Sequence, residues 1–287
     1  MRILVAGTGF TGKRILTRLQ KSGHEVWGLN RSGALAEMKE GRILKGDVLL
    51  EDGLKNLAAL PEMDLLISTL SGTGQSDPKA YRSVYVDGPR RIVDQLKWRD
   101  ASRVWMLGST GVYGVKDGGW VDENTEVNPL HRNGEVQVAA ETALASSCMQ
   151  SCVLRLSGLY GPGRVRLIRQ ALRKRDFLKP EVWANQLHAE DVAGLVSFLV
   201  ERKRPPPSLL LVSDAEPALR KDIFTWLRRE MNCPEGTLDE DHPTRAQTDR
   251  GNKRIDSSRM QSLGYRLRYP SFREGLGELL PTKFQEG

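Results

Sequence analysis

The chain begins Met1-Arg-Ile-Leu-Val-Ala-Gly-Thr-Gly-Phe-Thr-Gly12, and this stretch decides the fold. The apolar run Ile3–Ala6 is short enough for a buried strand, and from Thr11 onward the apolar residues recur at helical spacing. Between them the glycines follow the pattern Gly-x-Gly-x-x-Gly, which binds a dinucleotide pyrophosphate when it joins a strand to a helix. Glycines alone also mark ordinary turns, so the strand-to-helix context carries the argument. The predicted cofactor contacts here are Gly7, Thr8, Gly9, Phe10, Thr11 and Gly12.

Length and composition place the chain among soluble α/β proteins. It has 287 residues, 39% of them hydrophobic, which suffices for one large domain or for a large and a small one. The apolar start is too short for a signal peptide, and no later apolar run approaches a membrane span. The three cysteines show neither paired metal spacing nor a disulfide framework. We therefore expect a cytoplasmic protein with no metal site and no membrane partner.

The net charge of +7 raises the question of nucleic-acid binding. The basic residues are scattered along the chain, and no aromatic-interleaved patch or nucleic-acid module is recognisable. A basic surface also suits phosphate-bearing small molecules. We expect a small-molecule substrate and no nucleic-acid partner.

Strand-like and helical segments alternate, which predicts a Rossmann-type, doubly wound parallel sheet with helices on both faces. The character changes beyond residue 158. This predicts an NAD(P)-binding Rossmann domain over 1–158 and a small C-terminal substrate-binding portion over 159–287 that is interwoven with the sheet. Strands are predicted over 3–6, 25–29, 42–45, 64–69, 103–107, 152–156 and 209–212, helices near 51–60, 79–99, 134–147 and 220–231, a basic helix after 164, and a polar loop over 232–254.

The end of the second predicted strand selects the cofactor. An acidic residue about 20 positions after the glycine motif would bind the adenosine ribose hydroxyl of NAD. Here the segment reads Asn30-Arg31-Ser32, without a carboxylate, and the planar guanidinium of Arg31 suits a 2′-phosphate. We predict NADP in preference to NAD, with an ordinary surface arginine as the alternative for Arg31.

Further cofactor contacts are predicted where the third and fourth strands end, because ligands bind at the carboxyl edge of open α/β sheets. The carboxylate of Asp47 suits the adenine amino group, and a helix cap or loop carboxylate is its alternative. Together with the second-strand residues, the predicted contacts are Asn30, Arg31, Asp47, Val48, Thr69, Leu70 and Ser71.

Four motifs in order along the chain carry a family resemblance. They are Gly7–Gly12, Gly108-Ser-Thr-Gly-Val-Tyr-Gly114, Leu154-Arg-Leu-Ser-Gly-Leu-Tyr-Gly-Pro-Gly163 and Leu187-His-Ala-Glu-Asp-Val-Ala193. Together they resemble the extended short-chain dehydrogenase/reductase superfamily, the NAD(P)-dependent epimerase/dehydratase family, over almost the whole chain. The resemblance implies reversible hydride transfer on a nucleotide-sugar-like substrate by a serine, a tyrosine and a lysine. Ser109 matches the serine, which orients the substrate hydroxyl.

The Tyr-x-x-x-Lys pair of the family is missing. In register, Asn133 takes the tyrosine position and Gln137 takes the lysine position, and no Tyr-x-x-x-Lys occurs anywhere in the chain. Asparagine cannot exchange a proton near neutral pH, and glutamine carries no charge that would lower the pKa of a neighbour. The chain therefore resembles atypical members of the superfamily, which keep the cofactor fold and lose the pair.

Other residues are candidates for the chemistry that remains. His131 carries an imidazole, the side chain most often used for acid/base catalysis, and an exposed loop residue is the alternative. Tyr113 carries a phenol, and a structural turn residue is the alternative. Arg164 and Arg166 are candidates for binding an anionic substrate, and a solvated basic helix face is the alternative. For His188 the family resemblance implies a place in the wall of the substrate cleft.

Two hypotheses of function follow. In the first, the chain is an NAD(P)-binding oxidoreductase or epimerase-like enzyme with non-standard acid/base residues, acting on a nucleotide-sugar-like or other small polar substrate. In the second, it is a non-catalytic dinucleotide-binding or redox-sensing module. The resemblance further implies a homodimer built from the helices near 79–99 and 134–147.

Overall fold

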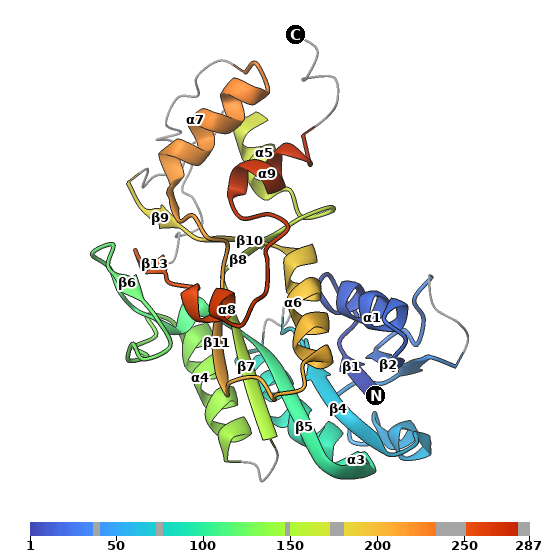
Figure 1. The fold of residues 1–287 in the computed structure, drawn as a ribbon. Helices are drawn as coiled ribbons and strands as arrows, with labels where there is room; N and C mark the ends of the chain where they lie inside the picture. The colour runs from blue at the N-terminus through green and yellow to red at the C-terminus, as the bar shows by residue number, and fades with distance from the viewer. Residues whose placement is uncertain (37–40, 73–76, 147–149, 173–180, 234–250, 281–287) are drawn as a thin grey trace. The chain divides into compact units, whose positions relative to one another are not determined.

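The computed structural model describes residues 1–36, 41–72, 77–146, 150–172, 181–233 and 251–280 (Figure 1). A seven-stranded sheet has the order β11-β7-β5-β4-β1-β2-β3, and the pairs β1–β2, β1–β4, β2–β3 and β4–β5 are parallel. Helices flank the sheet, so the predicted Rossmann-type fold is confirmed. The strands are β1 Arg2–Ala6, β2 Glu25–Asn30, β3 Ile43–Lys45, β4 Met63–Ser68, β5 Trp98–Ser109, β7 Gln150–Leu156 and β11 Leu209–Val212.

The strand order reverses beside β1. The chain places β2 and β3 on one side of β1 and then returns to place β4 on the other side. The register pairs Ala6 with Ser68, and the Thr69 amide donates to the Ala6 carbonyl at 2.8 Å. The carboxyl ends of β1 and β4 therefore meet at the reversal, which is where open α/β sheets bind ligands.

Alternating residues of the buried strands pack against opposite layers. Leu4 and Ala6 of β1 share a hydrophobic cluster with Leu57 and Ile92. On α1, which follows β1, Ser22 at the C-terminal end contacts Ser197 of α6 through their hydroxyls at 3.2 Å, and the two helices lie side by side in Figure 1. The helices of these layers are α1 Gly12–Lys21, α2 Pro78–Tyr85, α3 Asp87–Gln95, α4 Arg132–Ala145 and α6 Ala189–Glu201.

The helix predicted over 79–99 is wrong in its extent. Two helices, α2 and α3, are separated at Val86, and the second ends at Gln95. Pro89 lies in the first turn of α3, where its missing N–H costs nothing. At the other end Trp98 already pairs with Met63 as a strand residue. The helix predicted near 51–60 is a short 3₁₀ helix, Lys55–Ala59.

Two compact units make up the chain. The first comprises 1–109, 132–155 and 192–210, and the second comprises 110–131, 156–191 and 211–287. Each unit contains segments that are far apart in sequence. Most of α6, for example, belongs to the first unit, although it lies beyond residue 158, where the sequence analysis placed the domain boundary. Within the described residues, no helix is long and apolar enough to cross a membrane.

The second unit has its own core, which includes Tyr160, Phe224, Leu227 and Phe272. Its short strands pair as β8 with β10, β9 with β12 and β6 with β13. The loop predicted over 232–254 lies outside the described residues from 234 to 250. The elements are β6 Trp120–Val121, β8 Gly158–Tyr160, α5 Arg166–Leu172, β9 Trp183–Ala184, β10 Gln186–His188, β12 Ala218–Leu219, α7 Arg220–Glu230, β13 Arg254–Ile255, α8 Ser258–Ser262 and α9 Phe272–Gly277.

Candidate functional site

The glycine turn between β1 and α1 is tightly built at two of its glycines. Gly7 has φ +93°, a conformation that side chains with a Cβ rarely adopt. A Cβ on Gly12 would collide with the Gly7 carbonyl oxygen, and the Thr69 hydroxyl donates to that same oxygen. The turn is therefore held by Thr69, the residue after β4, and packed closely against Gly12, the first residue of α1.

Gly9 differs from its neighbours because it faces open space. A Cβ built at this position meets nothing within 4 Å. Just beyond it α1 begins without a side-chain cap on its N-terminal amides and without an acidic residue in its first turn. The Lys13 and Arg14 amides already donate to the carbonyls of Gly9 and Thr11, and the helix dipole favours an anion in front of this turn. The geometry provides a cradle for a phosphate over Gly9.

At the end of β2, Asn30 organises the loop that follows. Its Nδ2 donates to the Thr8 hydroxyl at 2.6 Å, and its Oδ1 accepts from the Gly33 amide at 2.6 Å. This ties the β2 loop, in which Arg31 is exposed, to the glycine turn. No hydrogen bond or ion pair joins the Arg31 guanidinium to a described residue. Arg31 thus stands beside the glycine turn with its charge available to a ligand.

The loop after β3 is fixed by two kinds of contact. The Asp47 carboxylate accepts from the Leu49 amide at 2.9 Å, as a loop-closing group does. From α3, the Arg91 guanidinium donates to the carbonyls of Val48 and Leu50. Val48 is buried, and its side chain belongs to the same hydrophobic cluster as Leu4 and Ala6 of β1.

Beyond β4, Thr69, Leu70 and Ser71 continue the same sheet edge. Thr69 is bound to the glycine turn, Leu70 is half-buried and Ser71 is exposed. A Cβ on Gly88 of α3 would lie 3.2 Å from both Leu70 and Val48, so the glycine lets α3 approach these two side chains. The structure thus brings the predicted contacts of β1, β2, β3 and β4 to one edge of one unit.

On α4, the two positions that the sequence analysis assigned to the missing pair differ in burial. Asn133 is exposed, whereas Gln137 is 6% exposed, and i,i+4 spacing places them on one face of the helix. The Gln137 Oε1 has no hydrogen-bond partner within the described part of the chain. Ser109, the last residue of β5, is half-buried. A buried acceptor without a partner is costly unless a ligand or water satisfies it.

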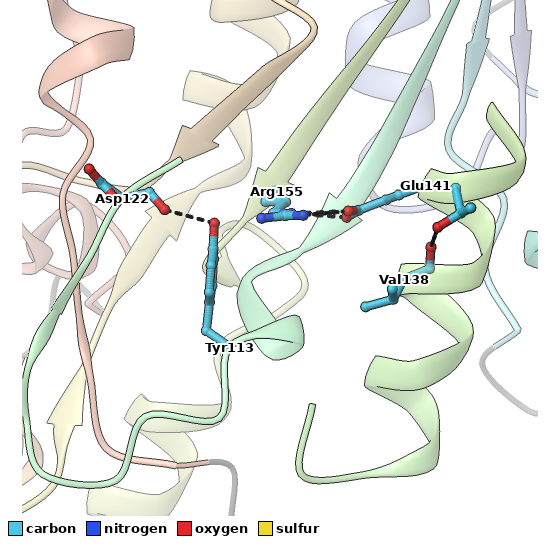
Figure 2. Close-up of polar contacts among 6 residues, drawn as sticks. Tyr113, Asp122, Val138, Glu141 and Arg155 are labelled. Atoms are coloured by element: carbon cyan, nitrogen blue, oxygen red, sulfur yellow. Dashed lines mark hydrogen bonds and ion pairs between the residues drawn. The ribbon is translucent and has the colours of Figure 1, made fainter. Parts of the chain in front are cut away.

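A buried ion pair anchors α4 to the sheet. Arg155 of β7 donates to both carboxylate oxygens of Glu141, at 3.1 and 3.2 Å from Nε and 2.6 Å from Nη2 (Figure 2). The two side chains are only 8% and 11% exposed. Gly108 of β5 packs closely against this pair, since a Cβ at that position would be 3.2 Å from a Glu141 carboxylate oxygen. The pair fixes the register of the helix that carries positions 133 and 137.

In the second unit Tyr113 is a buried structural residue rather than an accessible phenol. It is 1% exposed, and its hydroxyl donates to the Asp122 carbonyl at 2.9 Å (Figure 2). Lys253 donates to the Tyr113 carbonyl at 2.8 Å, and burial lowers the pKa of this lysine to about 8. His131, in contrast, is half-buried at the end of its loop.

The three substrate candidates of the second unit differ in accessibility. Arg164 and Arg166 are exposed, and the Arg164 amide closes the glycine-rich turn by donating to Gly161 at 2.8 Å. His188 is 2% exposed and its ring contacts the rings of Tyr160 and Tyr269, with centroids 5.1 and 4.0 Å away. The two arginines are therefore exposed, whereas the histidine is enclosed by aromatic rings.

The sequence matches the NAD dependent epimerase/dehydratase family over residues 3–210. The chain belongs to this family. No curated protein matches the chain. Among solved structures, a Methylobacillus flagellatus protein provisionally described as an NAD-dependent epimerase/dehydratase is 30% identical, with a TM-score of 0.77 and 97% of each chain covered.

Two solved structures that are less than 25% identical share the fold. MoeE5 in complex with UDP-glucose and NAD is 24% identical, with a TM-score of 0.75 and 96% of each chain covered. UDP-glucuronic acid 4-epimerase from Bacillus cereus, in complex with UDP-glucuronic acid and NAD, is 19% identical. Its TM-score is 0.74, and 96% of this chain and 97% of the epimerase are covered.

Some residues of this epimerase/dehydratase-family site escaped the sequence analysis. The Arg91 contacts to the β3 loop carry no local signal, because an arginine in a helix looks like any solvated side chain. The Arg155–Glu141 pair joins positions 14 apart, which no helical or strand period connects.

Proposed function

We propose that this chain binds a nicotinamide dinucleotide along the carboxyl edge of its sheet and acts as an oxidoreductase or epimerase-like enzyme on a nucleotide-sugar-like or other small polar substrate. The observation that supports dinucleotide binding most strongly is the open space at Gly9, in front of the start of α1, which has no side-chain cap. The buried Gln137 Oε1, which has no hydrogen-bond partner among the described residues, is a second supporting observation, since a ribose hydroxyl could donate to it. Solved structures that share the fold hold NAD and UDP-sugars, which supports the same assignment.

Particular residues would hold each part of the dinucleotide. The residues Gly7–Gly12 would bind the pyrophosphate, Asn30 and Arg31 the adenosine ribose, and Asp47 and Val48 the adenine, with Thr69–Ser71 lining the sheet edge. When bound, the nicotinamide supplies or accepts the hydride. Ser109 would orient the substrate oxygen by a hydrogen bond, and Arg164 and Arg166 would bind an anionic group of the substrate.

The proton donor remains the unusual part of the proposal. The Tyr113 hydroxyl already donates to a backbone carbonyl, which leaves His131 or water as the source of the proton. Loss of positioned acid/base help typically slows a reaction about 10²–10⁴-fold. The proposed enzyme is therefore a slow one. The homodimer through α2, α3 and α4 and the cytoplasmic location stay predictions.

Arg31 should confer preference for NADP. Arg31→Ala should weaken NADPH binding roughly 10-fold and leave NADH binding unchanged, because a charge-assisted hydrogen bond to the 2′-phosphate contributes about 1.5–3 kcal/mol and exposure reduces it toward the lower end. Titration of nicotinamide fluorescence measures both constants. A wild-type protein that prefers NADH would contradict this role for Arg31.

Gly9→Val should weaken dinucleotide binding without lowering the stability of the fold. The valine side chain would enter the open space over the turn, so the protein should keep its melting temperature while the dinucleotide binds roughly 10- to 100-fold more weakly, a loss of about 1.4–2.8 kcal/mol. Gly12→Ala is the contrasting variant, because its Cβ collides with the backbone and should lower stability as well. Unchanged binding by Gly9→Val would place the phosphate elsewhere.

A non-catalytic dinucleotide-binding or redox-sensing module is the second candidate, favoured by Asn133 and Gln137 in place of the acid/base pair. Ser109→Ala distinguishes the two functions. In an enzyme it should abolish turnover across a panel of nucleotide sugars while cofactor affinity stays nearly unchanged. A protein whose wild-type form binds the cofactor but turns over none of the panel would instead favour the module.

A further inference from the structure

Two tryptophans and an arginine meet on the surface of the second unit. Arg254 of β13 is the register partner of Trp120 on β6, and its guanidinium lies over the Trp120 ring, 4.8 Å from the ring centroid. The same guanidinium lies over the ring of Trp183 on β9, 5.0 Å from that centroid. The three strands lie close together in Figure 1. We call these side chains the Trp120–Arg254–Trp183 cluster.

The backbone and the rings together fix the position of the Arg254 guanidinium. Its Nε donates to the Gly118 carbonyl at 2.8 Å, and the Arg254 amide donates to the Gly119 carbonyl at 2.9 Å. Gly118 has φ +84°, and a Cβ there would be 3.2 Å from the Trp183 ring, so this loop packs closely against the ring. Attraction between the cation and the two rings adds to these bonds. The guanidinium is therefore already ordered before any ligand binds it.

Within the described part of the chain, no carboxylate forms an ion pair with Arg254. Two other arginines that lie over an aromatic ring, Arg268 and Arg273, each form an ion pair with a glutamate. Asp117, in the loop before β6, accepts from the Gly119 amide at 2.9 Å instead. Of the Arg254 side chain, only Nε donates to a described residue. Its two terminal nitrogens therefore present the planar fork that matches a carboxylate or a phosphate.

Trp120 supplies an apolar surface beside this fork. It is 55% exposed, whereas every other tryptophan of the chain is buried or half-buried. An exposed indole contributes little of the stabilisation that burial would give. Tryptophan and arginine are also the side chains on which binding energy is most often concentrated. A ligand that covers the Trp120 ring would remove this apolar surface from water.

We propose that the Trp120–Arg254–Trp183 cluster binds an oxyanion, a carboxylate or a phosphate, that is attached to a planar ring. The terminal nitrogens of Arg254 donate to the oxyanion, and the ring of the ligand packs against the exposed indole of Trp120. Trp183 holds the guanidinium in place. All three residues belong to the second unit, so the site is independent of the dinucleotide contacts proposed on the first unit.

Benzoate and phenyl phosphate are the probes for this site, and the indole N–H signals in NMR spectra of the isotope-labelled full chain are the readout. Trp120→Phe identifies the Trp120 signal by its loss. Both probes should shift that signal saturably, and the tighter one shows whether the natural ligand presents a carboxylate or a phosphate. Inorganic phosphate should bind more weakly than phenyl phosphate, because it has no ring to pack against Trp120.

Arg254→Lys keeps the charge but removes the planar fork, so it should weaken binding of the tighter probe roughly 10-fold. Arg268→Lys is the matched control, because Arg268 also lies over a ring but is paired with Glu278, and it should leave binding unchanged. The spread of the remaining indole signals shows that each variant is folded. Absence of a saturable shift with both probes, or wild-type affinity in folded Arg254→Lys, would overturn the site. Equal affinity for inorganic phosphate and phenyl phosphate would overturn the contact with Trp120.

Discussion

Asn133→Tyr combined with Gln137→Lys should raise the rate of hydride transfer about 10²–10⁴-fold, which is the usual contribution of positioned general acid/base groups. The two positions share one face of α4, and the Arg155–Glu141 pair already fixes that helix to the sheet. An introduced ammonium at position 137 would lower the pKa of an introduced phenol four residues earlier. The scaffold needs no further change to support the pair.

Single variants are the controls for this gain. Asn133→Tyr alone should stay slow, because its phenol lacks a nearby positive charge. The rate is measured from nicotinamide absorbance on whichever nucleotide sugar the wild type converts. Phenolate absorbance measures the pKa of the introduced tyrosine without any substrate. In the double variant, one tyrosine should have a pKa at least one unit below the ordinary value near 10. A double variant that binds cofactor yet shows only ordinary phenols would refute the assigned register.

Arg155→Met should cost about 3–5 kcal/mol of the free energy of unfolding, because it leaves the Glu141 carboxylate buried without its cation. Denaturant unfolding measures the loss. The double variant Arg155→Met/Glu141→Leu should recover most of it, since removing both charges also removes the uncompensated burial. If the double variant were as unstable as Arg155→Met, the arginine would stabilise the fold through packing rather than through its charge.

An exposed ion pair provides the matched control. Lys221 contacts Glu181 at 2.7 Å, against 2.6 Å in the buried pair, but its side chain is 45% exposed and its partner is 69% exposed. Lys221→Met should leave the free energy of unfolding almost unchanged, because solvent screens exposed charges. A large decrease in the free energy of unfolding of Lys221→Met would indicate that the N–O distance, rather than burial, determines how much an ion pair stabilises this protein.

The sheet edge was predictable because its signals are local. A short apolar run, a glycine spacing and the next helical period fix β1, the turn and α1 within the first dozen residues. The ends of β2, β3 and β4 then follow from the doubly wound order, which gathers their carboxyl ends beside β1. The absence of the Tyr-x-x-x-Lys pair was likewise readable from register alone.

Long-range and competing interactions set the limit of prediction. The helix expected over 79–99 ends at Gln95 because Trp98 gains a strand partner in Met63, which local propensity does not report. Tyr113 carried a phenol beside a functional motif, yet its burial and its bond to Asp122 emerge only from packing.

Equilibrium titration of the full chain with NADPH and with NADH, followed by nicotinamide fluorescence, tests the central claim most directly. We predict saturable binding in the micromolar range that is tighter for NADPH. Saturable binding with a preference for NADH would keep the cradle at Gly9 and remove the role of Arg31. Absence of binding by both nucleotides would contradict the account, because the open turn and the uncapped helix would then hold no dinucleotide.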